Sequence, residues 1–222
     1  MREKKFIRTL SCLCVVLMAC GTAFAQQGKI PSGAYKGPMV PMAAPETPDV
    51  APFYSNLVVD PCTSCNYSSA NGYFILGPNN CFAPGSTQWI SYPFIAGHSG
   101  TTRVVTLAIT NYGVCTPTSF RFTVAIYSDD PNCLNIPGTQ IGASAVATAP
   151  AAPCLTARAR LAVALTQGVK YWVVVTTDAT AQQIGTTAVW WQANTAWSDY
   201  NLNDGNGWIA FPPASPGGFS VQ

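Results

Sequence analysis

Few residues of this chain are suited to acid–base chemistry. His98 is the sole histidine and lies in Ala96-Gly-His-Ser-Gly100, a segment typical of a turn between two strands. A serine hydrolase needs a histidine as its general base, and most glycosidases need two carboxylates flanking the scissile bond. Glu46 is the one glutamate after the N-terminal apolar segment, and Asp129 and Asp130 precede a proline, where aspartate favours a turn. The sequence therefore predicts no catalytic centre and no enzymatic activity. The alternative is an unrecognised hydrolase, in which His98 would lie in a cleft beside an aspartate.

Calcium is the metal for which the sequence offers the most ligand types. Asp199, Asn201, Asn203 and Asp204 bring carboxylate and amide oxygens together within one short segment, and these are the oxygens that Ca²⁺ prefers. An EF-hand loop, however, has glycine at its sixth position and glutamate at its twelfth, and this segment has neither. Its Asp-Gly and Asn-Gly pairs also suit a hairpin turn. The four residues are weak calcium candidates, and we predict no bound metal and no cofactor.

Cysteines offer a third kind of chemistry. Of the nine, three lie in the N-terminal apolar segment, and six follow it. An even number of cysteines in an exported chain predicts disulfides, here three, although the sequence does not choose among the pairings. We expect Cys133 to pair with Cys154, because both lie at the ends of a probable hairpin. The alternative is a zinc site built on Cys62 and Cys65, for which the single histidine is remote in sequence. The six predicted disulfide cysteines are Cys62, Cys65, Cys81, Cys115, Cys133 and Cys154.

Aromatic residues gather near the C-terminus, interleaved with asparagine and aspartate. Planar rings beside amide and carboxylate groups are typical of a sugar-binding surface, but they are equally typical of a core between sheets. Trp190 and Trp191 are adjacent, so they must face opposite sides of a strand, and one of them is expected in the core. The predicted ligand-binding residues are Trp191, Trp197, Tyr200, Trp208 and Asn201.

The first 25 residues are predicted to be a secretory signal peptide. A basic head, MREKKFIR, precedes an apolar run from Leu10 to Phe24 that ends in Ala23-Phe-Ala25. This three-part layout indicates export and cleavage after Ala25. The alternative is lipidation of Cys20 within Leu17-Met-Ala-Cys20, which would anchor the protein in a membrane.

Removal of the signal leaves a chain that is close to neutral. The whole sequence has 11 basic and 9 acidic residues, of which the first eight residues hold 4 and 1, so 7 basic and 8 acidic residues remain. Without a basic stripe, nucleic acid is not an expected partner. No later segment resembles a membrane span, so we expect no transmembrane segment in the mature chain. The exported protein could be secreted, periplasmic or bound at the cell surface.

Two further regions follow the signal peptide. Residues 26–54 are crowded with proline, glycine and alanine and show no periodicity, which predicts a disordered linker. Residues 55–222 show apolar residues at alternate positions, punctuated by glycine and proline, which predicts antiparallel strands. The fold class is all-β, an antiparallel two-sheet sandwich, either jelly-roll-like or Ig-like, with disulfides.

Eight strands are predicted. In Phe120–Tyr127, the clearest, the phenylalanines face the core and Arg121 faces away. The segment Tyr171–Thr177 is apolar on both faces and should be central in its sheet, after a turn at Gly168. Prolines in and after Ala143–Ala152 favour strand and loop over helix. The remaining predicted strands are Tyr73–Leu76, Trp89–Ile95, Val104–Thr110, Thr156–Leu165, Thr186–Gln192 and Trp208–Phe211.

Three of these segments also resemble a known family. They are WISYPFIAGHSGTTRVVTLAIT, FTVAIYSDDPNCLNIPGTQIGA and ALTQGVKYWVVVTTDAT. In this order, and with the tryptophan-rich end, the chain from Trp89 to Phe211 resembles bacterial extracellular β-sandwich domains of the choice-of-anchor type. The six cysteines and the region from Asn56 to Cys81 depart from that pattern. The resemblance implies the fold and carries over no functional residue.

These observations predict a non-catalytic secreted or surface module with a structural or interaction role. Its partner would be a protein or a polysaccharide at the cell surface. The alternative is a carbohydrate-binding module that uses the C-terminal tryptophan and tyrosine residues.

Overall fold

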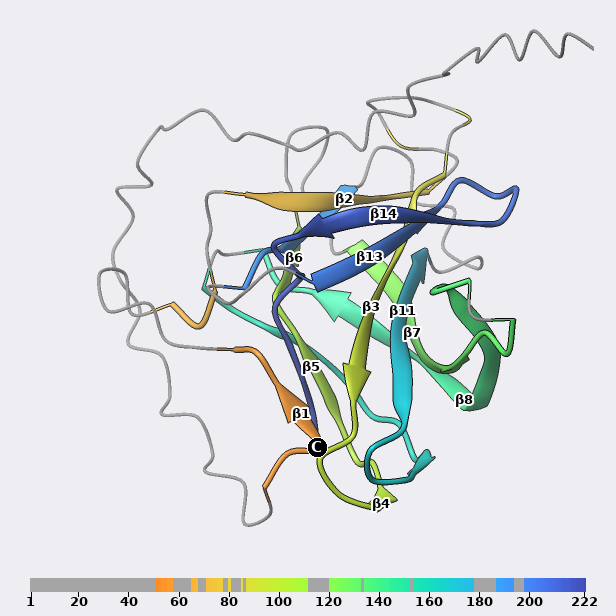
Figure 1. The fold of residues 1–222 in the computed structure, drawn as a ribbon. Helices are drawn as coiled ribbons and strands as arrows, with labels where there is room; N and C mark the ends of the chain where they lie inside the picture. The colour runs from red at the N-terminus through yellow and green to blue at the C-terminus, as the bar shows by residue number, and fades with distance from the viewer. Residues whose placement is uncertain are drawn as a thin grey trace, which may run out of the picture.

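The computed structural model shows a fold built of strands (Figure 1). Among the residues that it describes, there is no helix, and every pair of neighbouring strands is antiparallel. The predicted all-β, antiparallel class is thus confirmed. Within that same part of the chain, no helix is long and apolar enough to cross a membrane. The described residues are 51–57, 65–67, 71–77, 80, 85, 87–111, 120–132, 134–151, 154–177, 187–193 and 198–222.

Several predictions concern residues outside these ranges. They include the signal peptide, all but the last few residues of the predicted linker, and Trp197. Four of the six predicted disulfide cysteines, namely Cys62, Cys81, Cys115 and Cys133, also lie outside them.

A six-stranded sheet forms the largest part of the fold. The apolar segment that we predicted to be central lies inside this sheet, between two strands that both come earlier in the chain. Both faces of this central strand are buried, as expected for a strand with no polar face. In order across the sheet, the strands are β14 (Trp208–Ala214), β13 (Ser198–Asn203), β3 (Trp89–Ile95), β11 (Lys170–Thr177), β7 (Phe120–Asp129) and β8 (Pro137–Ala149).

The other strands form three smaller sheets. The four-stranded sheet contains β1 (Tyr54–Ser55), β15 (Phe219–Val221), β5 (Val105–Leu107) and β9 (Ala157–Ala159). The three-stranded sheet contains β2 (Gly72–Leu76), β12 (Thr187–Trp191) and β6 (Ile109–Asn111). A two-stranded sheet pairs β10 (Ala164–Leu165) with β4 (Gly100–Thr101).

Ala108 joins the four-stranded sheet to the three-stranded sheet. Its N–H donates to the carbonyl of Gly218, and its carbonyl accepts from the N–H of Trp191, each at 2.8 Å. The N–H of Gly218 donates in turn to the carbonyl of Trp191 at 2.8 Å. The predicted strand Val104–Thr110 is therefore divided at this residue into β5 and β6, because each half pairs with different neighbours.

The main core lies between the six-stranded sheet and the two sheets that meet at Ala108. One continuous cluster of buried side chains draws on both sides, for example Tyr92 and Val173 from the first and Trp190 and Phe219 from the second. In β7 the alternation follows the prediction, with Phe120, Phe122, Val124 and Ile126 buried in this core and Arg121 exposed. The turn glycine predicted before β11, Gly168, has a φ of +76°.

A second, smaller apolar cluster lies on the other face of the three-stranded sheet. It consists of Tyr67, Phe74, Leu76, Ala108, Val189 and Trp191. Trp190 belongs to the main core and Trp191 to this cluster, so the two adjacent tryptophans face opposite sides of β12, as their spacing requires.

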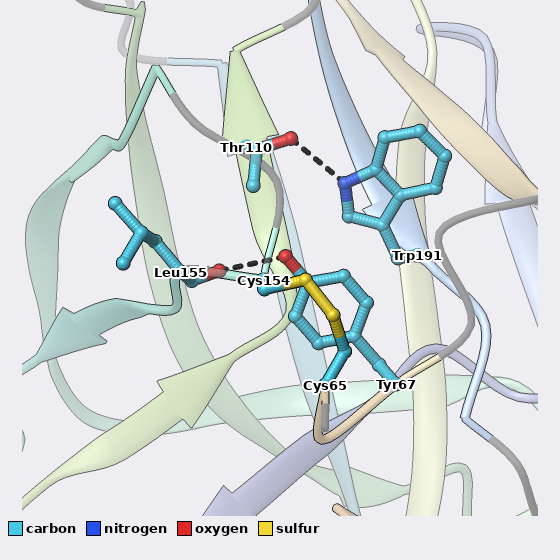
Figure 2. The surroundings of a disulfide bond; sticks show 6 residues. All are labelled: Cys65, Tyr67, Thr110, Cys154, Leu155 and Trp191. Carbon is cyan, nitrogen blue, oxygen red and sulfur yellow. Dashed lines mark hydrogen bonds between the residues drawn. A yellow bond between two sulfur atoms is a disulfide. The ribbon is translucent and has the colours of Figure 1, made fainter. Parts of the chain in front are cut away.

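One disulfide closes this second cluster. Cys65 is bonded to Cys154, with Cα atoms 5.0 Å apart. Next to it, the Tyr67 hydroxyl donates to the Leu155 carbonyl at 2.8 Å, while Trp191 Nε1 donates to Thr110 Oγ1 at 2.7 Å (Figure 2). The bond thus fixes the segment that contributes Tyr67, whose side chain has no exposed surface.

The predicted pairing of Cys133 with Cys154 is therefore wrong. β8 begins at Pro137, four positions after Cys133 in the sequence, and runs extended for 13 residues. At about 3.3 Å per residue, it advances the chain by about 40 Å along its path before Cys154 is reached. The two cysteines were expected at the ends of one hairpin, but β8 carries Cys154 to the three-stranded sheet instead.

β8 overlaps the segment Ala143–Ala152, for which strand and loop are predicted, but it begins earlier, at Pro137. It is built largely from alanine, glycine, serine and threonine, which give a weak alternation. The sequence predicts a turn where β13 lies, because Asn201 and Asn203 resemble loop composition although they lie in the sheet. The predicted strand Thr156–Leu165 is divided into β9 and β10.

We expect loss of this disulfide to lower the free energy of unfolding. Cys65→Ser and Cys154→Ser should each cost about 2–5 kcal/mol, since the bond closes a loop of 89 residues. Urea unfolding under non-reducing conditions, followed by tryptophan fluorescence, would measure the loss. The double variant should lose about as much as either single variant. A doubled loss would show that the two cysteines act independently and would contradict the pairing.

Candidate functional site

The outward face of the six-stranded sheet carries the main group of polar side chains in the described structure. Strand alternation decides which residues reach it. In β13, Tyr200 and Leu202 belong to the main core, so Asn201 and Asn203 lie on the opposite face. Both asparagines are nevertheless buried, with exposed fractions of 0% and 8%.

Trp172 is the centre of one polar network on this face. Its side chain has no exposed surface, although it lies on the side of β11 away from the main core. Its Nε1 donates to Asp129 Oδ1 at 2.7 Å. Lys170 Nζ lies 3.1 Å from the same carboxylate oxygen and 4.6 Å from the centre of the Trp172 ring. The lysine therefore combines an ion pair with a cation–π contact.

The turn between β7 and β8 closes over this network. Lys170 Nζ donates to Asn135 Oδ1, and Asn201 Nδ2 donates to the Asn135 carbonyl at 3.1 Å. Asn135 has a φ of +54°, which asparagine tolerates better than most residues. Asp130 Oδ1 accepts from the N–H of Asn132 at 2.7 Å within the same turn. These polar groups thus hold the turn against β11 and β13.

Three buried polar atoms beside this network have no hydrogen-bond partner within the described part of the chain. They are Trp89 Nε1, Ser91 Oγ and Asn201 Oδ1. Ser91 pairs across β3 and β13 with Asn201, and Trp89 pairs with Asn203. An indole donor, a hydroxyl and an amide acceptor are therefore grouped on two adjacent strands. Buried polar atoms without partners are uncommon in folded proteins, and they often mark a site for water or a ligand.

Two of the predicted ligand-binding rings are in apolar cores. Trp191 is 3% exposed in the second cluster, and Tyr200 is 7% exposed in the main core. The Tyr200 ring lies 4.8 Å from that of Tyr73 and stacks on Phe211 at 5.2 Å. Burial first, and then the neighbouring Tyr73, raise the pKa of the Tyr200 phenol. Neither Trp191 nor Tyr200 offers a ring face on which a sugar could stack.

The other two described members of that prediction, Trp208 and Asn201, lie on the outward face. Asn203 stands between Trp89 and Trp208 in one cross-strand row, because it pairs with both. Strands are spaced by about 4.8 Å, so the two tryptophan backbones are about 10 Å apart. Both tryptophans are half-buried. Sequence reasoning missed Trp89 and Ser91, although alternation within their predicted strand placed them on one face.

Two of the four calcium candidates accept hydrogen bonds from the backbone, and the other two lie at earlier positions of β13. Asn203 Oδ1 accepts from the N–H of Gly205 at 2.8 Å, and Asp204 Oδ1 accepts from the N–H of Asn206 at 3.0 Å. These bonds stabilise the β13–β14 hairpin, where Gly205 has a φ of +101°, as the turn interpretation expected. Asn201 lies within β13, and Asp199 is the second residue of that strand. Among the described residues, no three His, Cys, Asp or Glu side chains are grouped to hold a metal.

His98 takes part in a different set of contacts, at the loop after β3. Its ring packs on Phe53, with centroids 4.0 Å apart, and its Nε2 donates to the Ala51 carbonyl at 2.9 Å. These contacts tie the loop after β3 to the chain before β1. They account for the histidine as a structural residue.

Comparison of the chain with protein-family models and with curated protein sequences finds no match.

We expect Ser91→Ala to leave the free energy of unfolding unchanged or to raise it by about 1 kcal/mol. Removing a buried hydroxyl without a partner also removes the cost of its desolvation. The matched control is Thr102→Val, because Thr102 Oγ1 is equally buried but donates to the Leu161 carbonyl at 2.8 Å and accepts from the N–H of Val163 at 3.0 Å. That variant should lose about 1–3 kcal/mol. An equal loss for Ser91→Ala in urea unfolding would show that its hydroxyl has a partner.

Proposed function

We propose that this protein is a non-catalytic exported module with a structural or interaction role, built as a two-layer β-sandwich. The observation that supports it best is the use of the outward polar groups. Lys170 contacts both Asp129 and Asn135, and Asp129 accepts a hydrogen bond from Trp172, so these groups fasten the β7–β8 turn. A carboxylate with an ammonium group and an indole N–H as partners is suited to holding that turn, and poorly suited to accepting a proton from a substrate.

The low charge of the mature chain agrees with this role. With 7 basic and 8 acidic residues after the predicted signal, the surface offers no strong field of either sign to attract a charged partner. The resemblance to extracellular sandwich domains points to the same kind of module. Its partner would be a surface protein or a polysaccharide.

Export is tested by the N-terminus of the protein released from cells that express the full chain. Signal cleavage predicts that Edman sequencing or mass spectrometry finds Gln26 as the first residue. Lipidation would instead leave a lipid-modified Cys20 at the N-terminus and the protein in the membrane fraction. An uncleaved chain in the cytoplasm would contradict export by either route.

A carbohydrate-binding face is the second candidate function, supported by the row of Trp89, Asn203 and Trp208. Two half-buried indoles flank an amide there, and the indole N–H of Trp89 has no partner among the described residues. Ring faces that stack on sugars and polar groups that bind hydroxyls are the parts such a site needs. This version of the hypothesis replaces Trp191 and Tyr200, whose rings are in the cores.

Retention on insoluble polysaccharides and titration with soluble glycans, followed by tryptophan fluorescence, separate the two candidates. If the row binds sugar, Trp208→Ala should lose about tenfold or more in affinity, equivalent to at least about 1.4 kcal/mol. Its thermal melt should stay intact. Ile209→Ala is the matched control, because Ile209 is exposed on the opposite face of the same strand. Absence of binding across the panel would eliminate the carbohydrate candidate and leave a protein partner.

A further inference from the structure

The two edges of the six-stranded sheet differ in how they are protected. β14, at one edge, contains Pro212 and Pro213. Proline has no N–H to offer, and it is a common guard of edge strands. β8, at the other edge, has no charged residue and no proline from Gly138 to Ala149. Charged side chains and proline are the usual means of blocking a further strand, and the stretch from Gly138 to Ala149 has neither.

Within the described ranges, the outer edge of β8 also has no backbone partner. Among the described residues, backbone hydrogen bonds join β8 to β7 alone. Figure 1 shows β8 as a long, curved strand at the border of the sheet. It bends at Gly142, whose φ is +68° and whose carbonyl accepts from Gln140 Nε2 at 2.9 Å. Beyond the bend, the seven residues Ala143–Ala149 form an uninterrupted stretch.

This stretch suits pairing with a copy of itself. In an antiparallel pair centred on Val146, the exposed Ser144 faces Thr148, and Val146 faces its own counterpart. Serine–threonine and β-branched pairs are favourable across strands. The inward positions are all alanine, so they bring no steric conflict. No like charges oppose each other, and Val146, at 46% exposed, is one of the large apolar side chains left in water.

We propose that Ala143–Ala149 of β8 pairs antiparallel with the same stretch of a second copy of this chain. The pairing makes a two-fold dimer in which two six-stranded sheets continue into one. This inference rests on the proposed interaction role and names its partner. The chain's own segment 26–54 is a poorer occupant, because its frequent prolines interrupt the N–H groups that a strand must supply.

The test is the mass of the full, exported chain in solution, measured by sedimentation and light scattering over a range of concentrations. The wild type should be a dimer that dissociates on dilution. Val146→Lys and Val146→Glu should each be monomeric, because like charges would meet at the two-fold axis. An equimolar mixture of the two variants should restore a heterodimer. Ala210→Lys, at an exposed position of the proline-guarded edge strand β14, should leave the dimer intact.

Two outcomes would overturn the inference. One is a wild type that stays monomeric at every concentration, and the other is a dimer that persists in both charged variants. At concentrations where the wild type is dissociated, thermal melts of the variants should match that of the wild type, since Val146 is exposed. A monomeric wild type would leave the proposed function standing, because that proposal is tested by N-terminal processing and glycan binding. Failure of export would conversely leave the mass measurement as valid evidence on the pairing.

Discussion

The structure depends on the need to cover the central strand β11 on both faces. Its inward side chains fill the main core, but Trp172 on the outward face is large, apolar and fully buried as well. An indole buried this way needs both a cover and a partner for its N–H. Asp129 supplies the partner, and the β7–β8 turn, fastened by Lys170 and Asn135, lies against the same face. The polar residues of the sheet are thus organised around one tryptophan.

Ala108 is a second residue on which the arrangement depends. Its backbone joins the four-stranded sheet to the three-stranded sheet, and its side chain belongs to the small apolar cluster on the other face of the three-stranded sheet. Among the described residues no third sheet covers that cluster; the segment of Tyr67 lies over it, and the disulfide holds this segment in place. A disulfide can hold a short segment in place because it restricts the conformations of the unfolded chain.

The proposed role follows from how the polar groups and edges are used. Asp129 and Lys170 help to close the β7–β8 turn. In the described part of the chain, by contrast, polar atoms on β3 and β13 have no hydrogen-bond partner, and β8 has no strand on its outer edge. These features support the interaction role that we propose. β14 has two prolines within the strand, whereas β8 has one at its first residue and none from Gly138 to Ala149, so the two edges differ in how well they block a further strand.

The amino-acid sequence by itself determined the features that depend on local geometry. Alternation in an extended chain fixed the faces of β7, the double burial of β11, the opposite directions of Trp190 and Trp191, and the turn at Gly168. Tertiary structure decided what depends on strand order. It placed Ser91 opposite Asn201 and divided Val104–Thr110 between two sheets. It also buried Tyr200 in the core and paired Cys154 with Cys65 rather than with Cys133. The physical reason is that each side chain's direction is set by its own backbone, whereas its neighbours are set by distant strands that compete for the same edges.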